Sequence, residues 1–286
     1  MKKVLLASTA LVLSAGVAAA DVSVSGDGRM GVRQLAETGA DLLFSSRIRI
    51  AFSASGETDG GLSFGGGIRA DNASGGASGT AGSVFIEGAF GKLTMGDVDG
   101  AAQQATGHVS GVGYTGLGDL NESTFLGGGE DPTALYEYST GDLSVYVSAG
   151  QQEQSDELGL GVAYSFGNIG VGLGYETEDG AAPFDNIDHT VVTVSAGFGD
   201  ATVKVLFGSA SGDSVDGDQS AVSIDYVAGA TTITAFYADD EELGGAEAMG
   251  LGVAYDLGGG AALKAGYASN ETISESGYEI GITMSF

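Results

Sequence analysis

The last nine residues of the chain, 278–286, read YEIGITMSF and alternate between two kinds of side chain. One set of alternate positions is apolar and comprises Tyr278, Ile280, Ile282, Met284 and Phe286. The positions between them are small or polar, as at Glu279, Thr283 and Ser285. Because successive side chains of a β-strand point to opposite faces, this pattern predicts a strand that is apolar on one face.

The same alternation recurs throughout the chain. It is clear in 158–166 (LGLGVAYSF) and in 249–257 (MGLGVAYDL), where small or polar residues separate the large apolar ones. We count sixteen such segments, with expected starts near residues 22, 43, 61, 82, 91, 133, 143, 157, 169, 189, 201, 219, 230, 248, 261 and 277. The sequence therefore predicts an all-β protein.

The direction of the apolar face is the next question. A soluble sandwich turns it inward, whereas a membrane barrel turns it toward lipid, and periodicity alone fits both. Three features favour the barrel. The other face is rich in small and charged residues, aromatic residues recur near strand ends, and tight turns such as Gly167-Asn168 alternate with longer acidic connections at Glu178–Asp188 and Asp239–Glu247. We expect a sixteen-stranded antiparallel transmembrane β-barrel, wide enough for an aqueous channel.

Residues 1–20 have the pattern of a secretory signal peptide. Two lysines begin it, the apolar run Val4–Val17 follows, and three alanines precede Asp21. The alternative, a membrane-anchoring helix, needs about 20 apolar residues, and this run is shorter. We therefore expect a cleaved segment 1–20 and a barrel domain over 21–286.

Composition excludes several other classes of protein. The chain has 38 acidic and 10 basic residues, a formal net charge of −28, and no cysteine. Loss of Lys2 and Lys3 with the signal peptide would make the charge −30. So negative a surface repels phosphates, which argues against nucleic-acid binding. Without cysteine the chain has no disulfide framework, thiolate metal site or cysteine nucleophile.

All five arginines fall in the first three predicted strands. By parity they lie on the face away from lipid: Arg29, Arg33, Arg47, Arg49 and Arg69. Neighbouring strands are about 4.8 Å apart, so these side chains are expected to form one cationic patch on the inner wall. The alternative is that the arginines only pair with local acids such as Asp27, Asp71 or Glu87.

One predicted connection, about 97–132, is much longer than the rest and carries little alternation. It holds six acids: Asp97, Asp99, Asp119, Glu122, Glu130 and Asp131. Loops of this length in a compact architecture are usually functional. Folded into the barrel, this loop would face its acids toward the arginines and create a transverse field that favours ions and dipolar solutes. A large external loop is the alternative.

Several segments resemble the trimeric general porins of purple photosynthetic alphaproteobacteria. They are 25–32 (SGDGRMGV), 44–47 (FSSR), 84–97 (VFIEGAFGKLTMGD), 163–176 (AYSFGNIGVGLGYE) and 250–260 (GLGVAYDLGGG). Each segment alone is modest, but together they span most of the expected mature chain and include the terminal Phe286. The resemblance implies a homotrimer of sixteen-stranded barrels, whose third loop folds inside as an acidic rim facing basic residues of the wall.

At matching positions the resemblance puts Arg29, Arg47, Arg49 and Arg69 on the basic wall and the acids from Asp97 to Asp131 on the rim. Arg33 and the smaller number of loop acids depart from the family pattern. The resemblance also implies that Ca²⁺ can bind among the loop acids, with no cofactor required. It implies that the terminal Phe286 is the signal that the barrel-assembly machinery recognises.

Signals for other chemistry are weak. His108 lies in the long connection, and His189 follows Asp188, where we expect a surface histidine rather than half of a catalytic pair. No H-E-x-x-H motif occurs. We therefore expect no enzyme but an outer-membrane porin, embedded in lipid, that passes small hydrophilic solutes and ions. The alternatives are an outer-membrane barrel enzyme and a secreted soluble β-rich binding protein or adhesin.

Overall fold

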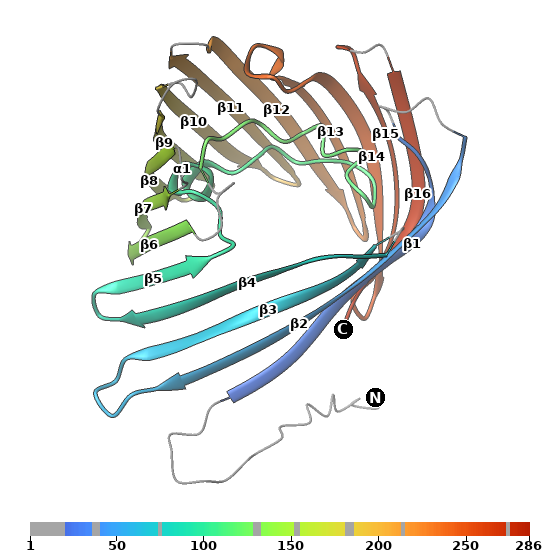
Figure 1. Ribbon diagram of the computed structural model, residues 1–286. Helices are drawn as coiled ribbons and strands as arrows, with labels where there is room; N and C mark the ends of the chain where they lie inside the picture. The colour runs from blue at the N-terminus through green and yellow to red at the C-terminus, as the bar shows by residue number, and fades with distance from the viewer. Residues whose placement is uncertain are drawn as a thin grey trace.

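The computed structural model describes residues 21–35, 41–73, 76–127, 133–151, 155–180, 186–212, 215–272 and 275–286. These residues form one closed barrel of sixteen strands (Figure 1). Each strand pairs antiparallel with the next along the chain, and β1 pairs with β16. The predicted antiparallel barrel and its strand number are therefore confirmed.

The strands run in chain order around the barrel. Their bounds are β1 Asp21–Gln34, β2 Leu43–Glu57, β3 Ser63–Ala73, β4 Gly76–Gly88, β5 Gly91–Gly96, β6 Thr133–Thr140, β7 Leu143–Gln151, β8 Ser155–Phe166, β9 Ile169–Gly180, β10 Ile187–Phe198, β11 Ala201–Gly212, β12 Asp216–Ala228, β13 Thr231–Asp239, β14 Glu247–Gly258, β15 Ala261–Asn270 and β16 Glu275–Ser285.

Two expected boundaries are wrong. β4 begins at Gly76 instead of near residue 82, because the sequence 76–81 (GASGTA) lacks apolar alternation yet pairs with the end of β3. The acidic connection expected over Glu178–Asp188 is shorter, since β9 continues to Gly180 and β10 begins at Ile187. In both places backbone pairing with a neighbour extends a strand beyond its hydrophobic pattern.

The outer face of the barrel is apolar. In β8, Leu158, Leu160 and Val162 are exposed, while Gly159 and Gly161 between them are buried from inside. Exposed aromatic residues lie toward the strand ends, as at Tyr138, Tyr164, Phe166, Tyr175, Tyr226, Tyr255, Tyr267 and Tyr278. An apolar band flanked by aromatic residues is the surface that a barrel presents to lipid and its two interfaces.

The chain's last residue completes the closure of the barrel. Gly26 in β1 donates its N–H to the carbonyl of Phe286 at 2.7 Å and accepts the N–H of Phe286 at 2.9 Å. The ring of Phe286 lies against Gly26, where an added Cβ would come within 2.7 Å of it. Glycine at this position therefore makes room for the terminal aromatic side chain.

The connection between β5 and β6 folds into the barrel. It contains the short helix α1 (Ala101–Thr106) and then crosses the interior toward β13 and β14 (Figure 1). A single 3₁₀ turn, η1 (Glu241–Leu243), lies between β13 and β14. Among the described residues, no helix is long and apolar enough to cross a membrane. The prediction that the third loop folds inward is confirmed.

Candidate functional site

The segment 97–127 of the inward-folded connection, called the constriction loop below, lies directly on the inner wall. α1 begins beside β7, where the Ala101 N–H donates to Ser148 Oγ at 2.9 Å. On β9, a Cβ added at Gly174 would lie 2.7 Å from the Cα of Ala102. The small inner residues of this wall thus let the loop backbone approach closely.

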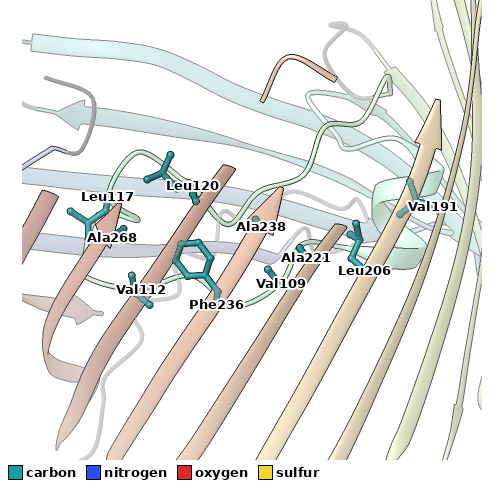
Figure 2. Close-up of a cluster of buried hydrophobic side chains, with 11 residues drawn as sticks. Val109, Val112, Leu117, Leu120, Val191, Leu206, Ala221, Phe236, Ala238 and Ala268 are labelled. Atoms are coloured by element: carbon teal, nitrogen blue, oxygen red, sulfur yellow. The ribbon is translucent and has the colours of Figure 1, made fainter. Parts of the chain in front are cut away.

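Apolar packing fixes the middle of the loop. Val109, Val112, Leu117 and Leu120 form a buried cluster with wall residues that include Leu206 of β11 and Phe236 of β13. Figure 2 shows these loop side chains meeting the wall on neighbouring strands. The inner face of β10 to β15 is therefore partly a dry contact with the loop. The hydrophobic core of the molecule lies there, inside the barrel.

Carboxylates of the wall bind the loop backbone at three places. Glu279 accepts two hydrogen bonds from Thr115, one from the Thr115 N–H at 2.6 Å and one from the Thr115 Oγ1 hydroxyl at 2.5 Å. Asp240, just after β13, accepts from Thr124 N–H at 2.8 Å and Thr124 Oγ1 at 2.6 Å. Glu176 of β9 accepts the N–H groups of Leu126 at 2.6 Å and Gly127 at 3.1 Å.

A buried relay of side chains supports the last of these contacts. Gln219 Nε2 donates to the carbonyl of Thr124 at 3.0 Å and lies 2.7 Å from His189 Nε2. Because that amide nitrogen can only donate, His189 Nε2 accepts, and its Nδ1 carries the proton that it donates to Glu176 at 2.7 Å. The expectation of a surface position for His189 is wrong, since its side chain is 1% exposed.

Lys204 of β11 holds the segment just after α1. Its Nζ donates to the carbonyl oxygens of Thr106 at 2.6 Å and His108 at 2.7 Å. His108 itself accepts the N–H of Ser123 at 3.1 Å through Nδ1, which ties the two halves of the constriction loop together. The loop is thus bound to the wall and to itself along most of its length.

The five predicted arginines lie on β1, β2 and β3, and their ion pairs are local. Arg47 pairs with Asp27 at 3.2 Å. Asp71 pairs with Arg49 at 2.9 Å and with Arg69 at 2.7 Å. These contacts correspond to the alternative of local pairing, although the arginines still outnumber their two acidic partners.

Arg29 and Arg33 extend this patch along β1. Arg29 Nη1 lies 3.4 Å from the carbonyl of Tyr114, so this arginine contacts the constriction loop directly. Arg33 is opposite Glu279 in the pairing of β1 with β16 and is half-buried. The basic wall and the loop therefore meet at Tyr114.

The acids of the loop have a different environment. Asp97, Asp99, Asp119 and Glu122 are exposed. Burial of part of its side chain raises the pKa of Glu122, and the negative charges of Asp119 and Asp99 raise it further. These three acids therefore lie close enough to interact. Within the described ranges, no ion pair joins them to the arginines, and the predicted site residues Glu130 and Asp131 lie outside those ranges.

No metal-ligand cluster supports the calcium prediction. Among the residues that the structure describes, no group of three or more His, Asp or Glu side chains could hold a metal ion. The described acids of the loop thus do not fit a calcium site by themselves. Calcium binding stays a prediction.

Sequence reasoning missed the residues that hold the loop: Glu176, Asp240 and Glu279, together with Lys204, His189 and Gln219. A signal for two of them was present. On β9, Glu176 follows the inner glycines Gly170, Gly172 and Gly174, and on β16 Glu279 lies between the inner glycines Gly277 and Gly281. A carboxylate next to such small inner residues marks a place where the wall meets another part of the chain.

Comparison with known proteins agrees with this architecture. A family model for Gram-negative porins matches residues 7–273. The chain is a Gram-negative porin. The porin of Rhodobacter capsulatus is 36% identical over 288 residues, covering 88% of this chain and 95% of that relative. The porin of Fuscovulum blasticum is 27% identical over 289 residues, covering 90% and 98%.

Solved porin structures share the fold. A porin structure refined at 1.8 Å superposes with a TM-score of 0.78 at 31% identity, covering 93% of this chain and all of that one. A variant of the Rh. blastica porin gives a TM-score of 0.76 at 25% identity, with the same coverage. This porin therefore forms a diffusion channel in the outer membrane for small hydrophilic solutes and ions.

Proposed function

We propose that diffusion through this porin is controlled at a charge-polarised constriction. One side is the basic wall formed by Arg29, Arg33, Arg47, Arg49 and Arg69. The other side is the acidic rim of the constriction loop. Its acids within the described residues are exposed and comprise Asp97, Asp99, Asp119 and Glu122. The observation that carries the proposal is the contact of Arg29 with the loop at Tyr114, because it brings basic wall and loop together.

Charges fixed on two sides of a narrow, water-filled opening set ion preference and orient dipolar solutes. The arginines exceed their partners Asp27 and Asp71 in number, so the wall keeps an excess of positive charge. The acids of the rim keep an excess of negative charge. Apolar solutes would have to displace ordered water from this field and are expected to pass poorly.

Reversal potentials in a salt gradient test the proposal. Replacing Arg29, Arg47 and Arg49 with Ala removes three positive charges and leaves Asp27 without its arginine. Selectivity should shift toward cations. Lys92→Ala, in β5 outside the arginine patch, is the control and should shift it less. An unchanged reversal potential in the triple variant would mean that the arginines do not line the constriction.

We further propose that the channel has no catalytic activity. The His189–Glu176 pair is the arrangement closest to a catalytic one, but its side chains are 1% and 0% exposed. Both lie under the constriction loop, so a substrate in the channel has no access to them. The pair serves to hold the loop.

We propose that the porin assembles as a homotrimer through the outer face of β1 to β5. That face has an apolar hollow of about 540 Å³ over Gly66 and Gly82, lined by Val22, Phe52, Ile68, Val84 and Met95. Side chains of a second copy can fill it with lasting packing contacts, whereas fluid lipid chains fill it only transiently. Ile68→Asp should reduce the trimer fraction in detergent, measured by light scattering, while Leu160→Asp on β8 should not.

We also propose that Phe286 is the residue read by the barrel-assembly machinery, in agreement with its terminal, 64% exposed side chain. Phe286→Ala keeps the backbone pairing with Gly26. It should therefore lower the yield of assembled barrel in cells while purified chains still fold in detergent. Equal loss in both settings would assign the side chain to stability alone.

A further inference from the structure

Among the described residues, the wall that faces the constriction loop carries four buried carboxylates. Three of them, Glu176, Asp240 and Glu279, accept backbone N–H groups of the loop. The fourth is Glu157 of β8, which is 4% exposed. The three that bind the loop come from separate places on the barrel: Glu176 in β9, Asp240 after β13 and Glu279 in β16. Their loop partners, Thr115, Thr124 and the pair Leu126 and Gly127, are spread over the second half of the loop.

Burial makes these contacts stronger than surface hydrogen bonds. Glu176 is 0%, Glu279 2% and Asp240 3% exposed. A carboxylate at such a site is costly unless donors surround it, and the loop supplies most of those donors. The loop therefore stabilises the buried carboxylates of the wall, and these carboxylates in turn hold the loop in place.

We propose that Glu176, Asp240 and Glu279 are positioning residues that fix the constriction loop against the wall and thereby set the opening of the channel. They act through the loop and do not contact solutes. The inference rests on the proposed constriction, since a shift of the loop changes permeation only where the loop lines the narrowest part.

The donors at each carboxylate differ, which gives a test that separates hydrogen bonding from charge. Glu279 faces one N–H and one hydroxyl of Thr115. A hydroxyl can donate or accept, so Glu279→Gln can satisfy both with its carbonyl and its amide group. Glu279→Ala removes both contacts.

At Asp240 a single oxygen, Oδ2, receives both donors of Thr124. Asp240→Asn can place its carbonyl oxygen there and keep them, whereas Asp240→Ala cannot. At Glu176 both oxygens face loop N–H groups, which can only donate. Glu176→Gln therefore leaves at least one of the N–H groups of Leu126 and Gly127 opposite another donor.

Single-channel recording in planar bilayers measures the result. Glu279→Ala, Asp240→Ala and Glu176→Gln should raise the time spent outside the main conductance level. The increase should be roughly 10- to 100-fold, the effect of losing a hydrogen bond to a charged group. Glu279→Gln and Asp240→Asn should stay near the parent, although each removes a charge. Glu87→Gln, on β4 and exposed, is the matched control.

The outcomes discriminate between explanations. If Glu279→Gln behaves like Glu279→Ala, the charge matters rather than the contacts, and the inference is overturned. Parent-like recordings for Glu176→Gln overturn it as well. The arginine variants test the proposed constriction independently, because a normal shift in their reversal potential shows that the constriction exists whatever the carboxylate variants do.

A chemical readout in detergent avoids the need for channel insertion. The chain has no cysteine, so Val112→Cys, at a loop position that is 4% exposed, introduces a single thiol under the loop. In this background a water-soluble thiol reagent should label Glu279→Ala roughly 10- to 100-fold faster than Glu279→Gln. Equal labelling rates in folded barrels of both variants would show that Glu279 does not hold the loop.

Discussion

The inner wall of this porin has two unlike halves. β1 to β3 carry five arginines, and three of them pair with Asp27 or Asp71 of the same three strands. β9 to β16 carry mostly small residues and a few buried carboxylates, and the constriction loop covers part of them. One half pairs its charged side chains mainly with each other, whereas the other uses its charged side chains to bind the constriction loop.

The difference shows that a charge on the inner face of a barrel has no fixed meaning. Arg49 and Glu176 both occupy inward positions in strands. Arg49 has 29% of its side chain exposed and a neighbour to pair with, while Glu176 is completely buried under loop N–H groups. The surroundings decide whether such a residue shapes the field of the channel or its geometry.

The largest effect on the half covered by the constriction loop is expected from removing its apolar contacts with the loop. Leu206→Ala deletes a side chain that is 1% exposed and packs in the cluster shared with the loop. We expect a loss of about 2–5 kcal/mol in the free energy of unfolding and increased flicker of the channel current. Urea titration in detergent and single-channel recording measure the two.

Val205→Ala is the control for this change, because its side chain lies on the outer face of the same strand. It removes contacts with lipid and leaves the loop untouched. Flicker in this variant equal to that of Leu206→Ala would contradict the assignment of the loop contact to the inner side.

The uncovered half responds in selectivity more than in stability. Asp71→Asn removes the carboxylate that Arg49 and Arg69 share. Partly exposed ion pairs contribute little, so the free energy of unfolding should fall by about 1 kcal/mol or less. Two arginines are then unneutralised, and the reversal potential should shift toward anions. A shift in selectivity toward cations, or a large loss of stability, would mean that Asp71 behaves like the buried carboxylates under the constriction loop.

The smallest expected effect sharpens the comparison at the rim. Burial and the nearby Asp119 and Asp99 raise the pKa of Glu122, so on acidification it takes up its proton before a solvated glutamate does. From neutral pH downward, cation preference should therefore begin to fall above the ordinary glutamate range. When the reversal potential is measured as a function of pH, Glu122→Gln should lack this first change. If the variant still shows it, another group than Glu122 causes it.

The sequence was sufficient for the barrel but not for the path of the loop. Alternation indicated all sixteen strands because lipid on one face and the lumen on the other impose it on each of them, although the first part of β4 lacks it. The contact of Thr115 with Glu279 joins positions far apart in the chain, and hydrogen bonds of an irregular loop have no period. Strand parity also placed the arginines on the inner face. It could not decide whether they pair with local acids such as Asp27 and Asp71 or face the acids of the loop.

The pairing of Gly26 with Phe286 has a consequence for how the barrel is made. A chain that is synthesised and exported from its amino end delivers β1 first and β16 last. Until β16 arrives, one edge of β1 is unpaired and could add to any other exposed strand. The pairing of β1 with β16 therefore closes the barrel only when the last strand is present. A chain shortened by its last strand would keep two open edges, and it would be a substrate for aggregation or proteolysis instead of a smaller pore.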